Sequence, residues 1–127
     1  MSLELNAKMP YMRFNWAMHS ARTGRLSWEE RGIFDAVRCE LWAVVGCRMP
    51  LAHLCRLLRI EEASEDARRI QGLIALGLLT VDAEGVVGEP VQVAEFAAAV
   101  ELGKINAANG KKGGRPPKLG PDHRSEF

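Results

Sequence analysis

The most constraining feature of the sequence is a capped amphipathic segment that begins at Ser27. Ser27 and Glu30 have the three-residue spacing of a capping box, in which each side chain accepts a hydrogen bond from the other residue's backbone. Apolar residues then recur at spacings of three and four to about Val45, and Gly46 supplies a stop. The segment is therefore predicted to be a long helix with one buried face.

Two further helices are predicted after this one. Apolar spacing from Leu51 to Leu58, directly after Pro50, indicates a helix of about three turns with Arg56 and Arg59 on its other side. Ser64 is the expected N-cap of the next helix, which ends at Gly77. The inward positions of the three helices predict a core that centres on Phe34, Val37, Leu41, Leu54, Leu58, Ile70, Leu73 and Ile74.

Strand signals flank these helices. The apolar runs 78–81 and 86–87 are separated by four residues that include Gly85, which is typical of a hairpin with a positive φ at the glycine. Met12, Phe14 and Trp16 alternate with polar residues and predict a short edge strand, followed by a loop over 17–26.

A fourth helix is predicted to begin at Pro90 and to reach about Asn106. Beyond Asn109 the chain is rich in Gly, Pro and basic residues, so it is expected to be disordered when free. We therefore expect one domain over residues 11–108 and a flexible basic tail over 109–127. The sequence has no membrane-helix or leader pattern, which predicts a cytoplasmic protein with no membrane partner.

Charge is strongly segregated along the chain. Residues 1–60 carry nine Lys/Arg and five Asp/Glu, residues 61–103 carry two and nine, and residues 104–127 carry six and two. The ends are basic and the middle is acidic, although the net charge is only +1. A polyanion such as DNA is therefore expected to meet the ends of the chain.

The order of these elements is that of a mainly α, winged helix-turn-helix fold, with a three-helix core, a short β-hairpin wing and a C-terminal helix before the disordered basic tail. The segment from Leu73 to Val87 resembles the passage from third helix to wing. Residues 11–118 also resemble a phage and prophage family of YdaU type. The motifs that carry this resemblance are Trp16, Leu26-Ser27, Glu30-Arg31-Gly32, a helix end near Trp42, and Met49-Pro50-Leu51-Ala52.

That resemblance implies a winged-helix-like domain followed by a basic tail, similar to the N-terminal domains of phage replication proteins. It implies no catalytic constellation, and a fold does not by itself fix a function.

Seven cations are the candidate DNA-binding residues: Arg68, Arg69, Lys104, Lys111, Lys112, Arg115 and Lys118. The first two lie on the third predicted helix, whose start is crowded by four carboxylates, Glu61, Glu62, Glu65 and Asp66. Phosphates would be repelled there, so groove reading and an ordinary solvated helix both stay open.

The tail offers a second mode of binding. Gly114-Arg115-Pro116, flanked by lysines, resembles an AT-hook, whose arginine lies along a narrow minor groove. A solubilising linker to a downstream domain is the alternative.

Catalysis and metal binding are not predicted. His19, His53 and His123 are expected in a loop, a helix and the tail, without a nucleophile and acid at suitable spacing. Three cysteines in apolar sequence indicate reduced, buried thiols. A zinc site at Cys47, His53 and Cys55 is the alternative, but it lacks a fourth ligand and the usual spacing. No cofactor and no metal are expected.

The sequence thus predicts a non-catalytic, nucleic-acid-binding module of a phage or prophage replication or regulatory protein, with DNA as the expected partner. The alternative is a protein-interaction module that docks a protein partner through its acidic third helix. No pattern predicts an oligomeric state.

Overall fold

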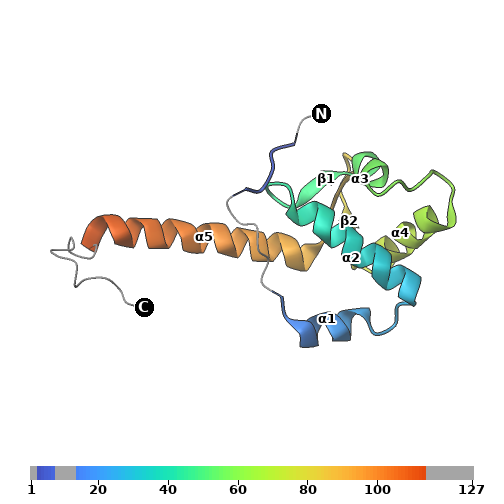
Figure 1. Cartoon of the computed structure of the whole chain (residues 1–127), viewed down its shortest axis with the longest axis horizontal. Coiled ribbons are helices and arrows are strands. Elements are labelled where there is room, and N and C mark those ends of the chain that lie inside the picture. Colours follow the sequence, from blue (N-terminus) through green and yellow to red (C-terminus); the bar gives the residue numbers. More distant parts are fainter. Residues whose placement is uncertain (1–2, 8–13, 114–127) are drawn as a thin grey trace, which may run out of the picture. The chain divides into compact units, whose positions relative to one another are not determined.

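The computed structural model describes residues 3–7 and 14–113 and is mainly α-helical (Figure 1). The described residues form five helices and one small antiparallel sheet. In chain order the elements are α1 (Trp16–Thr23), α2 (Trp28–Trp42), β1 (Arg48–Pro50), α3 (Leu51–Leu57), α4 (Glu65–Ala75), β2 (Thr80–Val81), β3 (Val86–Gly88) and α5 (Pro90–Gly113). The chain divides into two compact units, residues 1–97 and 98–127.

The capping box at the start of α2 is confirmed. The backbone N–H of Glu30 donates to Ser27 Oγ at 3.1 Å, and the backbone N–H of Ser27 donates to the Glu30 carboxylate at 2.8 Å. The helix ends at Trp42, earlier than the apolar pattern predicts. Val44 is still buried, but it lies in a turn that pairs with Leu5, and Gly46 follows with φ +86°.

The helices α3 and α4 are also confirmed. The first is two turns long rather than three, because Leu58 caps it and Arg59 takes a positive φ of 58°. In α4 the Ser64 hydroxyl accepts a hydrogen bond from the Ala67 backbone N–H at 3.1 Å, as an N-cap should. Gly77, with φ +80°, turns the chain after α4 as predicted.

The predicted hairpin is present and gains a third strand. The Asp82 carboxylate accepts from the backbone N–H groups of Glu84 and Val86, and Gly85 has φ +80°. Strand β1 adds to the other edge of β3, with Met49 opposite Val87, and gives the order β1-β3-β2. All pairings in this sheet are antiparallel.

The predicted edge strand and the loop after it are wrong for the described residues. Met12 lies outside them, and Trp16 begins α1 instead of continuing a strand. The reason is local: Asn15 Oδ1 accepts a hydrogen bond from the Met18 backbone N–H at 3.0 Å and caps a helix that runs to Thr23. An alternation over so few residues is too short to outweigh an N-cap.

Most of the expected core is buried, and two of its residues, Leu58 and Ile74, pack against it while remaining partly exposed. The fully buried members of the expected set are Phe34, Val37, Leu41, Leu54, Ile70 and Leu73. The expectation of buried thiols is met by Cys47 alone, because Cys55 is half-buried and Cys39 lies on the exposed face of α2.

Helix α5 begins at Pro90 as predicted but continues to Gly113, so residues 109–113 of the expected disordered tail are helical. Ala107 and Ala108 have the highest helix propensity, and Lys111 near the end of the helix complements its dipole. The rest of that tail lies outside the described residues. None of the helices in the described part of the chain is long and apolar enough to cross a membrane.

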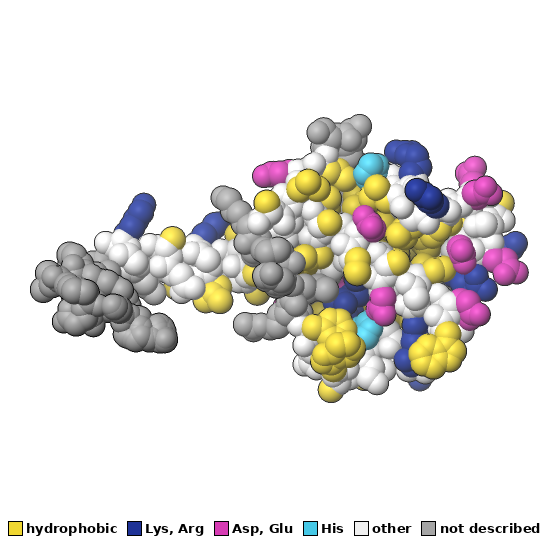
Figure 2. All heavy atoms as spheres, in the orientation of Figure 1, with side chains coloured by type: hydrophobic (Ala, Val, Ile, Leu, Met, Phe, Trp, Pro, Cys, Tyr) yellow, Lys and Arg dark blue, Asp and Glu magenta, His cyan; other side chains and the backbone are white. Residues whose placement is uncertain are grey.

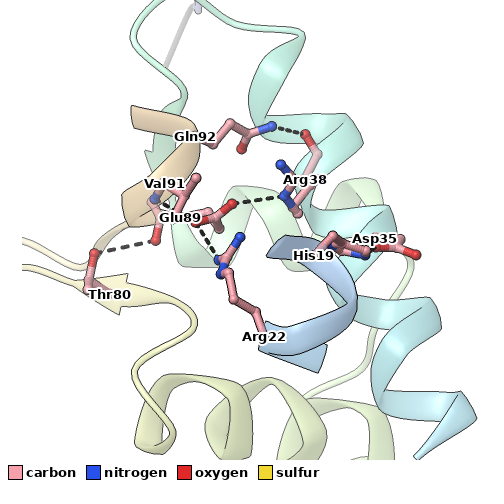
Figure 3. Close-up of polar contacts among 9 residues, drawn as sticks. His19, Arg22, Asp35, Arg38, Thr80, Glu89, Val91 and Gln92 are labelled. Carbon is pink, nitrogen blue, oxygen red and sulfur yellow. Dashed lines mark hydrogen bonds and ion pairs between the residues drawn. The ribbon is translucent and has the colours of Figure 1, made fainter. Parts of the chain in front are cut away.

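A buried ionic cluster ties α1, α2 and the start of α5 together (Figure 3). The Glu89 side chain is 0% exposed, and its two oxygens each lie 2.8 Å from a guanidinium, that of Arg22 on α1 and that of Arg38 on α2. The same carboxylate accepts from the Val91 backbone N–H at 2.7 Å, and Gln92 donates to the Arg38 carbonyl at 2.7 Å. A charge buried in this way is retained only because it is paired and hydrogen-bonded.

Replacing Leu54 by Ala is expected to lower the free energy of unfolding by about 2 to 5 kcal/mol, because the side chain is fully buried. Leu57→Ala is the matched control on the same helix. Its side chain is exposed, so the loss should stay below about 1 kcal/mol. Urea unfolding followed by circular dichroism measures both, and equal losses would contradict the burial described for α3.

Glu89→Gln is expected to lower the free energy of unfolding by about 3 to 5 kcal/mol, because it leaves the buried Arg38 guanidinium uncompensated. Glu65→Gln, which removes a solvent-exposed carboxylate from an ion pair, should cost far less. Thermal and urea unfolding of the two variants check this, and a Glu89→Gln protein as stable as the parent would refute the role of the cluster.

Candidate nucleic-acid interface

The outward face of α4 is the surface on which the sequence places its first two candidate residues. Ile70 and Leu73 hold the helix to the core, and the opposite side carries Arg68. Gly72 and Ala75 lie next to Arg68 on this side, and a Cβ at Gly72 would meet nothing within 4 Å. The side chains on this face are therefore small enough for another backbone to approach the helix closely.

The two neighbouring arginines, Arg68 and Arg69, differ in their ion pairs. Arg69 lies 2.6 Å from Asp66 and 3.5 Å from Glu65, so its charge is already compensated. The hydrogen bond to Asp66 raises the pKa of Arg69, and the charges of Asp66, Glu65 and Glu29 act in the same direction. Arg68 is exposed and forms no ion pair with any residue that the structure describes. Of these two arginines, only Arg68 is thus left to contact a phosphate.

Carboxylates gather where α4 begins. Glu61, Glu62, Glu65 and Asp66 are all exposed, and Figure 2 shows acidic side chains over the loop before α4 and over its first turn. They suit the positive end of the helix dipole, but they would repel the phosphates that flank a major groove. The N-terminal turn of α4 is therefore poorly suited to insertion in a groove.

The remaining candidate cations lie on α5 or beyond it. Lys104 and Lys111 are exposed in the unit of residues 98–127. Their seven-residue separation puts them on one face of α5, about 10 Å apart along its axis. Lys112 is in α5, but its side chain is not described, and Arg115 and Lys118 lie outside the described residues.

In the part of the chain that the structure describes, four further exposed arginines were not among the predicted site residues, namely Arg25, Arg48, Arg56 and Arg59. Arg56 lies on α3 and Arg59 just after it, and within the described part of the chain neither has an ion-pair partner. The sequence pattern placed both opposite the apolar face of their helix, and Arg56 has no carboxylate three or four residues away, so the sequence could have identified Arg56.

Exposed aromatic side chains were missed altogether. Trp16 is 76% exposed and Trp28 is 82% exposed. Counting one hundred degrees per residue along α2 places Trp28 well away from Phe34 and the buried face, so a helical wheel could have identified it. The exposure of Trp16 was not predicted because this residue was assigned to a strand.

A hollow of about 670 Å³ lies between α3, the start of α4 and the hairpin turn. Its lining includes the apolar residues Leu51, Ala52 and Ile70 together with three carboxylates and Arg56. The carboxylates are those of Glu61, Glu62 and Glu84. This acidic groove has the chemistry to accept a cationic, partly apolar segment rather than nucleic acid.

Two of the three histidines lie in described helices. His19 lies in α1 and not in a loop, and its Nε2 is 3.0 Å from Asp35 Oδ1. Its ring stacks on Phe34, with 6.0 Å between centroids. His53 lies in α3, and His123 is outside the described residues. Among residues 3–7 and 14–113, no three His, Cys, Asp or Glu side chains approach closely enough to hold a metal ion.

Comparisons with protein-family models, with curated proteins and with solved structures found no match to this chain. The resemblance to a YdaU-type family therefore stays a hypothesis. The function has to be argued from the surface that the structure presents.

Burial raises the pKa of the Cys47 thiol to about 12, and the charge of Glu89 adds to this effect. Cys47 therefore stays protonated in the fold at pH values at which an unfolded thiol ionises, so its contribution to stability is lost as pH rises from about 9 toward 12. At pH 8.5 iodoacetamide should label the exposed Cys39 quickly and Cys47 only on unfolding. Peptide mass spectrometry measures both rates, with Cys39→Ser as the control, and equal native rates would contradict this burial.

Proposed function

We propose that this chain is a winged helix-turn-helix module that binds nucleic acid and carries out no catalysis. The order α2, β1, α3, α4, β2, β3 and the antiparallel strand order β1-β3-β2 support the winged-helix assignment. In this assignment α4 is the recognition helix and the hairpin of β2 and β3 is the wing.

The observation that carries the proposal is the set of exposed guanidinium groups without ion pairs on α3, just after α3 and on α4. Arg56, Arg59 and Arg68 lack ion pairs to any described residue, whereas Arg22, Arg38 and Arg69 are held by carboxylates. Exposed cations that are not neutralised by the fold are the groups that can displace counterions from a phosphate backbone.

The acidic start of α4 shapes the mode of binding. Because it opposes insertion of the N-terminal turn in a groove, contact would fall on Arg68, which lies at the end of that turn on the outward side of α4, and on the cations of α5 and the tail. Lys104, Lys111 and Lys112 would bind phosphates, and Arg115 with Pro116 would enter a narrow minor groove. On the YdaU-type resemblance we propose that such a module serves phage or prophage replication or regulation.

A protein-interaction module is the second candidate, and the acidic groove favours it. The groove is lined by apolar residues and by the carboxylates of Glu61, Glu62 and Glu84. This lining is complementary to a basic amphipathic segment of a partner protein. In this candidate the carboxylates near α4 are the contact surface rather than an obstacle.

Most of the DNA affinity is expected to reside in the tail. Replacing Lys111, Lys112, Arg115 and Lys118 by Gln should reduce the slope of log affinity against log salt by up to about 3.6, at about 0.9 per phosphate contact. Arg68→Ala should reduce it by about 0.9, and Arg69→Ala, the matched control, should change it least because that charge is already paired. Fluorescence anisotropy with an A·T-rich duplex at several salt concentrations measures these slopes.

Two outcomes would overturn parts of this proposal. Loss of binding on Arg68→Ala, with only weaker binding in the tail variant, would place the affinity in α4. No salt-dependent binding of the intact chain to duplex or single strands would refute the nucleic-acid function and leave the acidic groove as the functional surface.

A further inference from the structure

A second hollow, of about 660 Å³, lies between α1 and α2 and is bordered by exposed aromatic rings. We call it the aromatic cleft and define it by Phe14, Trp16, His19, Trp28, Arg31 and Asp35, all of which line it. Figure 2 shows hydrophobic side chains standing out on this face over α1 and beside the first turn of α2, with charged and histidine side chains between them. Two indoles exposed to this extent are unusual unless they contact a partner.

The two indoles are braced by neighbouring side chains. The Arg31 guanidinium lies over the Trp28 ring at 5.3 Å from its centroid, and Arg31 Nε donates to the Thr23 carbonyl at 3.1 Å. Trp16 packs edge-on against Phe14, with 4.4 Å between ring centroids. These contacts hold the rings in place while most of their surface remains open, so little ordering entropy is lost when a flat ligand stacks on them.

The charge of the aromatic cleft fits an anionic ligand. Among the residues that the structure describes, its lining includes Arg31, Arg38 and His19 but only one carboxylate, that of Asp35, which is paired with His19. Glu89 engages Arg38, so Arg31 is the cation best placed to meet a ligand. The acidic groove near α4 has the reverse balance, with three carboxylates and one arginine.

Nearby Glu29 does not alter this balance. It does not line the cleft, and it lies close enough to Arg69 on α4 to help raise that residue's pKa.

We propose that the aromatic cleft binds unpaired nucleobases of a single-stranded nucleic acid, with bases stacked on Trp16 and Trp28 and a phosphate near Arg31. This inference rests on the proposed nucleic-acid function and deepens it by assigning single strands to the aromatic cleft, in addition to the duplex contacts proposed for the tail. Unpaired bases present a free π face to aromatic side chains, and a groove that combines such rings with a cation is how sequence-tolerant single-strand binding is built. In a duplex those faces are stacked on neighbouring base pairs and cannot reach the rings.

The test uses the full chain and its Trp16→Ala/Trp28→Ala double variant. Labelled dT12, U12 and a 12-base-pair duplex are titrated at fixed salt and followed by fluorescence anisotropy. Each lost base–aromatic stack should weaken single-strand affinity about 5- to 100-fold, while duplex affinity stays within about twofold. Comparison of dT12 with U12 shows whether DNA or RNA is the better source of the bases.

A second readout and two further variants separate stacking from folding. Trp42 is buried, so quenching of intrinsic tryptophan fluorescence by unlabelled dT12 reports on the two exposed indoles. Leu76→Ala, which removes an exposed hydrophobic side chain outside the cleft, should change neither affinity nor quenching. Arg31→Ala should weaken single-strand binding, and Arg31→Lys, which keeps the charge, should restore part of it.

The outcomes distinguish this inference from the function on which it rests. Unchanged single-strand affinity in the double variant, with duplex binding intact, would overturn the cleft assignment and leave the nucleic-acid function standing. Failure of the parent chain to bind any of the three ligands would refute both. Single-strand binding without tryptophan quenching would also refute the cleft as the stacking site.

Discussion

The Glu89 carboxylate is the group on which the arrangement of the first unit depends. A carboxylate without solvent is very costly unless cations and hydrogen-bond donors surround it, so its burial requires Arg22 and Arg38 to stay where they are. Glu89 lies between the end of β3 and the start of α5, while its partners lie on α1 and α2. One buried charge therefore fixes the sheet, two helices and the beginning of a third relative to one another (Figure 3).

The arginines of this cluster also contact the aromatic side chain between α1 and α2, where the aromatic cleft lies. Arg22 and Arg38 both approach the Phe34 ring, at 5.5 Å and 6.0 Å from its centroid, and His19 stacks on the same ring. Helix α1 thus packs on α2 through charged and aromatic groups rather than through aliphatic ones. Beside this contact the rings of Trp16 and Trp28 remain mostly exposed and border the aromatic cleft.

Features set by neighbouring residues could be predicted from the sequence, and features set by distant ones could not. The helix caps and turns act through hydrogen bonds or backbone angles within a few residues, so the sequence alone predicts them. They are formed by Ser27, Ser64, Gly77 and Gly85. Glu89 is separated from its two partners by 67 and 51 residues, and no periodic pattern marks such a pair. In the candidate site, Arg69 follows Asp66 by three residues, a spacing that allows an ion pair on a helix. Arg68 follows Glu65 at the same spacing, so only the structure shows which arginine is left without an ion pair.

Charged side chains are also segregated on the surface of the first unit. Within residues 3–7 and 14–97, carboxylates edge the groove beside α4, whereas arginine and histidine outnumber the single carboxylate in the aromatic cleft. A polyanion and a cationic peptide would consequently be favoured at different hollows of the same unit. The two proposed functions therefore depend on separate hollows with opposite charge balance.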